Sequence, residues 1–74
     1  MSIEHAPQRQ KLRAAYTIIE FCEAHRISRG ALYQLWAQNK GPRYFNAGKK
    51  RLISLEAAAD WRTEGERRAA GEAA

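Results

Sequence analysis

The sequence is short of cysteine, histidine and aspartate, and this shortage excludes most kinds of catalytic and metal site. Among its 74 residues there is one cysteine, Cys22, so no disulfide can form within the chain. Asp60 is the single aspartate, and the two histidines, His5 and His25, have no spacing that suits zinc. No Ser/His/Asp set, paired-carboxylate site or phosphate-binding glycine loop is visible. We therefore expect no enzymatic activity, no metal and no cofactor.

Long apolar runs are missing as well. No stretch approaches the roughly 18 consecutive apolar residues that a membrane-spanning helix needs. The first residues, MSIEHAPQRQ, lack the apolar core of a secretory signal peptide. A single thiol in a polar chain fits a reducing compartment. Together these features predict a cytoplasmic protein that does not bind membranes.

Acidic residues are absent from the middle of the chain. The formal net charge is +5. The whole excess lies in residues 26–51, which hold seven basic residues and no Asp or Glu. The basic residues of this block are Arg26, Arg29, Lys40, Arg43, Lys49, Lys50 and Arg51. The segment before it is neutral and the segment after it is slightly acidic. Such a block predicts a polyanionic partner.

Two short helices separated by a tight turn are predicted within residues 17–39. Thr17 and Glu20 form a T-x-x-E capping box at the start of the first helix, Thr17–His25. Ser28 caps the second helix, Arg29–Gln38, and Asn39 is its expected C-cap. The apolar residues at helical spacing are Ile18, Phe21 and Cys22, followed by Leu32, Leu35 and Trp36. This is the layout of a helix-turn-helix, whose second helix enters the DNA major groove.

The turn itself, His25–Ser28, carries two specific expectations. Ile27 is its only apolar residue and is expected to fill the angle between the helices. Arg26 is expected to adopt a positive φ, which glycine would adopt more easily.

A short β-hairpin is predicted for residues 43–53, with its turn at Ala47–Lys50. Gly48 supplies the positive φ that such a turn requires. Lys49, Lys50 and Arg51 follow it directly, so the hairpin is basic at its tip. A basic hairpin beside a helix-turn-helix is a wing, which lies along the DNA backbone or in the minor groove.

Ser54 is expected to cap a third helix, whose inward face includes Leu55, Ala58 and Trp61. The predicted fold is therefore mainly α with a small β-hairpin, a winged helix-turn-helix of three short helices plus the wing. Residues 1–15 are predicted to be a flexible arm, 16–63 the DNA-binding domain and 64–74 a charged tail. The tail has no apolar stripe, so we expect it to fray or to stay disordered.

Three stretches together, Tyr16–Trp36, Gly41–Ser54 and Leu55–Trp61, resemble the excisionase and AlpA-like group of small MerR-like winged helix-turn-helix proteins. Ser28-Arg29 followed by Leu32-Tyr33 is similar to the recognition helix of that group, and Gly48-Lys49-Lys50 is similar to its wing tip. The resemblance implies sequence-specific binding of double-stranded DNA in the bacterial cytoplasm, in association with the nucleoid. It implies a recombination directionality factor or a small transcriptional regulator, with an integrase or RNA polymerase as a partner.

The candidate DNA-binding residues fall into two sets. Those expected in the major groove are Ser28, Arg29, Gly30, Tyr33 and Gln34. Those expected on the backbone or in the minor groove are Lys40, Arg43, Lys49, Lys50 and Arg51. Gln34 can pair with adenine, and Arg29 with guanine or a phosphate. Two alternatives stay open at this point: Gly30 either admits a phosphate or packs on the first helix, and Tyr33 either contacts DNA or packs on the wing.

A different class of function is also compatible with the sequence. The basic face would then bind an acidic protein partner, and the protein would show no sequence preference for DNA. If DNA is the partner, a monomer of this size offers limited contact area. Cooperative self-association on DNA, through the 62–74 segment, is therefore expected.

Overall fold

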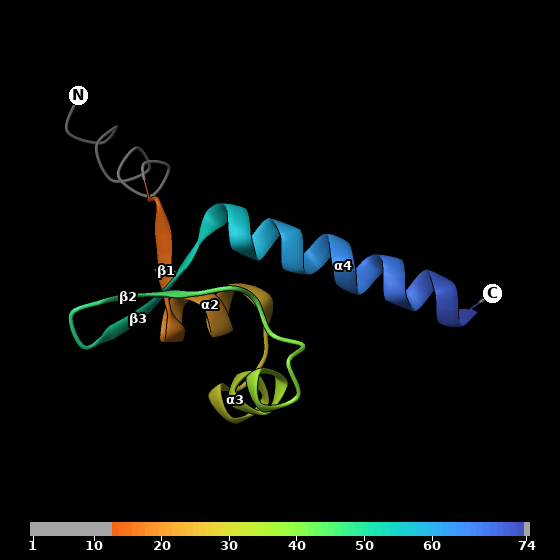
Figure 1. The fold of residues 1–74 in the computed structure, drawn as a ribbon, viewed down its shortest axis with the longest axis horizontal. Helices are drawn as coiled ribbons and strands as arrows, with labels where there is room; N and C mark the ends of the chain where they lie inside the picture. The colour runs from red at the N-terminus through yellow and green to blue at the C-terminus, as the bar shows by residue number, and fades with distance from the viewer. Residues whose placement is uncertain (1–12, 74) are drawn as a thin grey trace.

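The computed structural model describes residues 13–73, which fold into three helices and a three-stranded antiparallel sheet. The elements in chain order are β1 (Ala15–Thr17), α2 (Ile18–His25), α3 (Arg29–Ala37), β2 (Phe45–Ala47), β3 (Lys50–Ser54) and α4 (Leu55–Ala73). The β2–β3 hairpin and the far end of α4 extend to opposite sides of the domain (Figure 1). None of the helices in this range is both long and apolar enough to cross a membrane.

The sheet has the strand order β1-β3-β2, so that β3 is paired on both sides. The hairpin predicted for residues 43–53 is confirmed: Phe45 pairs with Leu52, and Ala47 pairs with Lys50. Strand β1 was not predicted. It pairs antiparallel with β3, and Tyr16 lies opposite Ile53. The sheet thus includes Ala15, which was assigned to the arm, while residues 1–12 of that arm lie outside the described range.

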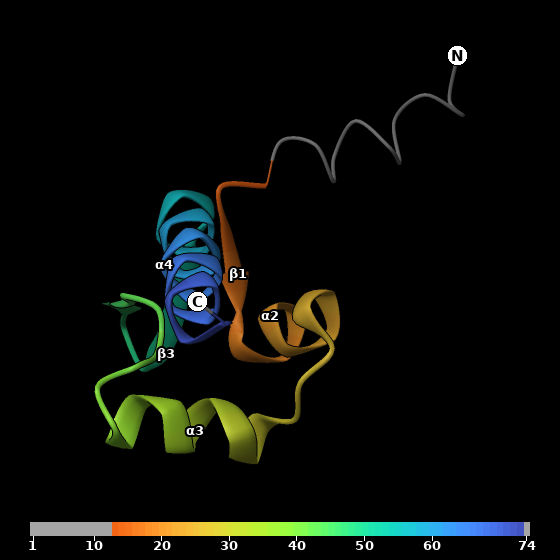
Figure 2. The ribbon, with the colours of Figure 1, turned by 90° about the vertical axis from the view of Figure 1, so that its right-hand side faces the viewer.

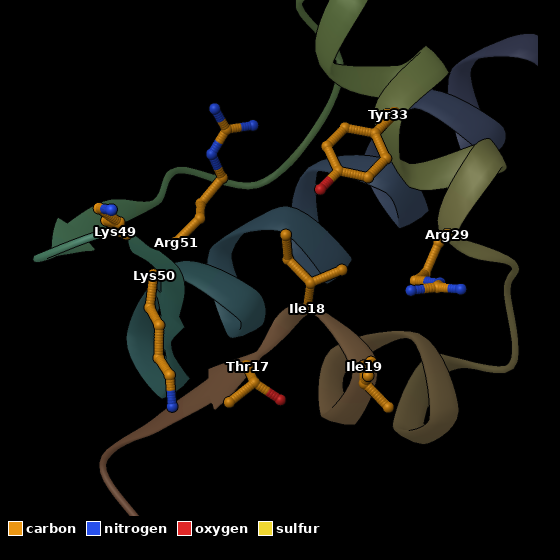
Figure 3. Close-up of a pocket in the computed structure, with 8 residues that line it drawn as sticks. All are labelled: Thr17, Ile18, Ile19, Arg29, Tyr33, Lys49, Lys50 and Arg51. Carbon is orange, nitrogen blue, oxygen red and sulfur yellow. The ribbon is translucent and has the colours of Figure 1, made fainter.

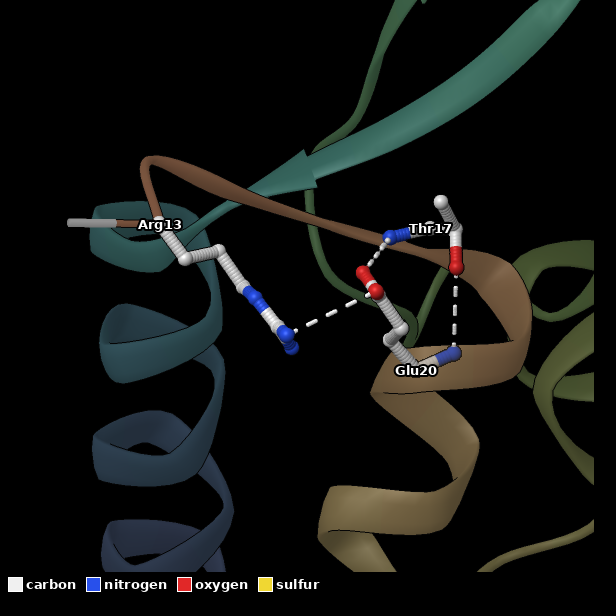
Figure 4. Close-up of polar contacts among 3 residues, drawn as sticks. All are labelled: Arg13, Thr17 and Glu20. Carbon is white, nitrogen blue, oxygen red and sulfur yellow. Dashed lines mark hydrogen bonds and ion pairs between the residues drawn. The ribbon is translucent and has the colours of Figure 1, made fainter. Parts of the chain in front are cut away.

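The predicted capping box at the start of α2 is confirmed (Figure 4). The backbone N–H of Glu20 donates to Thr17 Oγ1 at 3.1 Å, and the backbone N–H of Thr17 donates to Glu20 Oε1 at 3.0 Å. The same carboxylate lies 3.6 Å from the Arg13 guanidinium. These contacts fix the point where the chain changes from strand to helix.

A three-residue turn, Arg26–Ser28, joins α2 to α3. Arg26 has φ 60° and ψ 43°, which confirms the expected left-handed conformation. Ile27 is half-buried and packs against the core, as expected. The Ser28 hydroxyl accepts from the N–H of Ala31 at 3.0 Å and caps α3. The local sequence thus determines both helix boundaries at this turn.

Helix α3 ends at Ala37, one residue earlier than predicted, and Gln38 rather than Asn39 is its C-cap. The expectation for Asn39 was wrong because Asn39 has φ 61° and lies beyond the cap. Gly41 and Pro42 then turn the chain against the helix: Trp36 Nε1 donates to the carbonyl of Pro42 at 2.7 Å. The segment after α3 is therefore held close to the Trp36 indole.

The core lies where α2, α3, β3 and α4 meet. Its buried apolar residues are Phe21, Cys22, Leu32, Ile53, Ala57 and Ala58. Tyr16, Ile18, Ile27, Trp36 and Trp61 pack around them. Figure 2 looks along α4 and shows α2 and α4 on either side of β1, with α3 below them. The other residues predicted to face inward are confirmed, but Leu35 and Leu55 are only half-buried and do not belong to this cluster.

Helix α4 corrects the prediction for the C-terminal segment. It runs through 19 residues to Ala73, so the third helix is not short, and residues 64–73 of the tail that was expected to fray are helical. Residues 62–72 are all exposed. Helix propensity explains the difference, because Ala, Glu and Arg extend an existing helix at little cost even without an apolar stripe. The Ser54 hydroxyl caps the start, as predicted, by accepting from Ala57 N–H at 3.0 Å.

Candidate nucleic-acid interface

An open groove of about 630 Å³ lies between α3, the start of α2 and the tip of the β2–β3 hairpin (Figure 3). Its lining residues are Thr17, Ile18, Ile19, Arg29, Tyr33, Lys49, Lys50 and Arg51. Four of these are basic and none is acidic. We call it the basic groove. It brings together residues from both predicted sets of DNA-binding side chains.

The α3 wall of the basic groove is made by Arg29 and Tyr33. They lie four residues apart, so they share one face of the helix, and both are exposed. Leu32 lies between them in sequence but is fully buried, which turns the Arg29 face outward. Gln34 is also exposed on α3, although it does not line the groove. The outward face of α3 therefore carries three side chains that can form hydrogen bonds.

Ser28 and Gly30 contribute differently from those side chains. The Ser28 hydroxyl already serves as the cap of α3, through the N–H of Ala31. Gly30 is exposed, and a Cβ built there would meet nothing closer than Ser28 Oγ at 3.9 Å. Close packing on α2 therefore does not require a glycine at position 30. The first turn of α3 presents open backbone.

The hairpin wall is made by Lys49, Lys50 and Arg51. Gly48 has φ +65° and forms the turn, as predicted, and the two lysines beside it are exposed. Arg51 is half-buried. Its guanidinium carbon lies 4.2 Å from the ring centre of Tyr44 and 4.9 Å from that of Trp36. The hairpin therefore offers two exposed cations and one that is stacked on aromatic rings.

The third wall was missed by sequence reasoning. Thr17, Ile18 and Ile19 line the groove from the junction of β1 and α2. Ile19 is 54% exposed, while its neighbour Ile18 packs on the core. The sequence contains the signal, because Ile19 falls outside the helical stripe formed by Ile18, Phe21 and Cys22. The groove thus has a largely apolar third wall beside two walls that carry basic side chains.

Lys40 and Arg43 are not brought into the basic groove. They line a separate hollow beside α4, together with Asp60 and Trp61. Arg43 Nη2 lies 2.9 Å from Asp60 Oδ2, and both side chains are exposed. The backbone carbonyl of Lys40 accepts from Trp61 Nε1 at 2.8 Å. The predicted backbone set is therefore divided between two places on the surface.

The Cys22 thiol and the His25 imidazole both have structural roles. Cys22 lies in the core, where burial raises the pKa of its thiol and the Arg29 charge partly opposes that rise. His25 donates from Nδ1 to the Phe21 carbonyl at 2.9 Å, and its Nε2 accepts from Arg62 Nη1 at 2.9 Å. Within residues 13–73, no three His, Cys, Asp or Glu side chains gather to hold a metal ion.

Comparisons of the chain with protein-family models, with curated proteins and with solved structures gave no match. The function of the basic groove must therefore be judged from its geometry and its charge.

Proposed function

We propose that this protein is a sequence-specific double-stranded DNA-binding protein with a winged helix-turn-helix domain. In this proposal α2 and α3 are the helix pair, α3 is the recognition helix and the β2–β3 hairpin is the wing. One observation carries the proposal: the outward face of α3 and the basic tip of the hairpin border the same groove. A duplex docked there meets both elements at once.

The side chains on α3 suit the reading of base edges. The major groove of B-DNA is about 12 Å wide and admits one helix. Arg29 can donate two hydrogen bonds to guanine or hold a phosphate, and Gln34 can pair with adenine. Tyr33, which is 48% exposed, can donate to a phosphate or contact a thymine methyl group. These three positions are the proposed source of sequence preference.

The hairpin tip suits the DNA backbone. Lys49 lies in the turn, Lys50 begins β3, and both are exposed. Neither forms an ion pair with an acidic side chain of the described residues. Lysines of this kind release counterions when they meet phosphates, and their contribution to affinity does not depend on sequence. The proposed wing therefore adds affinity, and α3 adds specificity.

The resemblance to excisionase and AlpA-like proteins extends the proposal to a biological role. It favours a recombination directionality factor or a small transcriptional regulator in the bacterial cytoplasm, acting with an integrase or with RNA polymerase. A bending assay on the bound duplex separates these roles, because an excision factor is expected to bend its site and a simple repressor is not.

The proposal is tested by selection from a library of random duplex DNA, followed by titration of the selected duplex at several salt concentrations. We expect a recovered motif and an affinity that falls steeply as salt rises. Binding without a motif would contradict sequence specificity. No binding to any duplex would contradict the DNA-binding proposal and favour an acidic protein partner instead.

A further inference from the structure

Arg51 differs from the two lysines beside it, although all three belong to one basic run. Successive residues of a strand point to opposite faces. Figure 3 shows the side chains of Lys50 and Arg51 leaving the hairpin in opposite directions. Lys50 is exposed, whereas Arg51 is half-buried against Tyr44 and Trp36. Because its guanidinium is stacked on two aromatic rings, Arg51 is expected to have a different role from the solvent-exposed lysines.

The stack of Arg51, Tyr44 and Trp36 joins parts of the chain that otherwise touch little. Arg51 belongs to β3, Tyr44 precedes β2, and Trp36 belongs to α3. The Trp36 and Tyr44 ring centres are 5.0 Å apart. The backbone of α3 packs mainly against α2, not against the hairpin. The side chains of this stack are therefore a principal connection between α3 and the hairpin.

The stack also reaches the recognition face of α3. The ring centres of Trp36 and Tyr33 are 5.5 Å apart, with the planes at 68°. Trp36 is held from the other side by its hydrogen bond to the Pro42 carbonyl. A change in the position of Arg51 would therefore alter, through Trp36, the position of Tyr33, which lines the basic groove.

We propose that Arg51 is a positioning residue, whose guanidinium, stacked on Tyr44 and Trp36, fixes the hairpin against α3 and so sets the spacing between the hairpin lysines and Arg29. This inference rests on the proposed function. It assigns Arg51 to specificity rather than to a phosphate contact. Arg51 is the suited residue because a planar guanidinium stacks on aromatic rings, while an ammonium group is compact and strongly hydrated.

The test compares Arg51→Lys and Arg51→Gln with Lys50→Gln, using the selected duplex and a shuffled duplex over a range of salt. Lys50→Gln should weaken both complexes equally and lower the salt slope by about 0.9, as the loss of one phosphate contact does. Arg51→Lys keeps the charge, so it should leave the salt slope and the shuffled-duplex affinity unchanged, and Arg51→Gln should lower the salt slope by less than Lys50→Gln does. Both Arg51 variants should weaken binding to the selected duplex by about tenfold, the size of a partly buried cation–π contact.

Tyr44→Leu supplies the second arm of the test. If Arg51 acts through the ring, Tyr44→Leu and Arg51→Lys should each cost about tenfold, and the double variant should cost little more than either. The indole N–H resonance of Trp36 should shift in both single variants, while that of Trp61 should stay in place. The Trp61 signal is an internal control for folding.

Two results would overturn the inference. The first is an affinity of Arg51→Lys for the selected duplex equal to that of the wild-type protein. The second is a salt slope that falls as much in Arg51→Gln as in Lys50→Gln, while the Trp36 indole resonance does not move. Failure of the proposed function is a separate result, because the wild-type protein would then select no duplex at all. In that case the Trp36 resonance still shows whether Arg51 holds the stack.

Discussion

The tight turn between α2 and α3 places backbone strain on one residue, Arg26. Its φ of 60° is in the left-handed region, where a side chain with a Cβ is strained. We expect Arg26→Gly to raise the free energy of unfolding by about 1 kcal/mol, because glycine removes that strain. Urea unfolding measures the change. Arg26→Ala is the matched control: it removes the same charge, keeps the Cβ and should gain no stability. Equal gains in both variants would contradict the strain argument.

Gly41 is required for a different reason, since its φ is not positive and its neighbour is the constraint. A Cβ at position 41 would lie 2.3 Å from Trp36 Cδ1. We expect Gly41→Ala to lower the free energy of unfolding by about 1–3 kcal/mol, the usual cost of overpacking. Gly65→Ala is the control, because a Cβ there meets nothing within 4 Å. Gly65 lies inside α4, so alanine should stabilise the protein by up to about 1 kcal/mol. Loss of stability in both variants would contradict this reasoning.

Residue-scale features were predictable where the physics is local. The Thr17–Glu20 capping box, the Ser28 and Ser54 caps and the positive φ of Gly48 all depend on residues within a few positions of one another. The role of Arg51 was not predictable in this way. Its contacts with Trp36 and Tyr44 join residues that lie 15 and 7 positions away in sequence, and no local pattern encodes such a pairing.

At the scale of elements, strand β1 and the length of α4 differ from prediction, and both differences have physical explanations. Strand β1 has three residues and no alternating pattern of its own, so it forms because β3 provides a partner. Helix α4 continues to Ala73 because helix propensity suffices once the first turns are packed on β3. Prediction from apolar periodicity alone misses elements of both kinds.

The start of α2 gives a prediction at this scale. Thr17→Ala removes the acceptor for the Glu20 N–H and should lower the free energy of unfolding by about 1 kcal/mol, the usual cost of a lost N-cap. Glu20→Gln keeps an acceptor for the Thr17 N–H and loses only the charge facing Arg13. Its effect should be within about 0.5 kcal/mol, because a partly exposed ion pair at 3.6 Å contributes little. Thermal unfolding of the two variants tests the ranking, and a larger loss for Glu20→Gln would reverse the assignment.

At the scale of the whole molecule, the basic residues of the central block do not form one surface. Lys49 and Lys50 border the basic groove, while Lys40 and Arg43 lie beside α4. The sequence showed the charge excess but not this division, because the hollow beside α4 depends on the Arg43–Asp60 contact, between residues 17 positions apart.

This division predicts different effects for equal losses of charge. Lys49→Gln should weaken duplex binding and lower the salt slope by about 0.9. Arg43→Gln removes the same charge from a side chain already paired with Asp60, so its effect on both quantities should be much smaller. Fluorescence anisotropy with a labelled duplex over a salt series measures both. Equal effects of the two substitutions would mean that the basic groove is not the principal site.

Mapping the duplex on the protein by NMR would show whether α3 and the hairpin bind it together. Amide chemical shifts would be followed while the selected duplex is added to ¹⁵N-labelled protein. If α3 and the hairpin bind one duplex together, the shifts should be concentrated at Arg29–Gln34, at Thr17–Ile19 and at the hairpin tip, Gly48–Arg51. On a duplex that holds one copy of the protein, residues 62–72 of α4 should change little. Shifts confined to α4 and to the hollow around Arg43, with the basic groove unchanged, would contradict the central claim that α3 and the hairpin bind one duplex together.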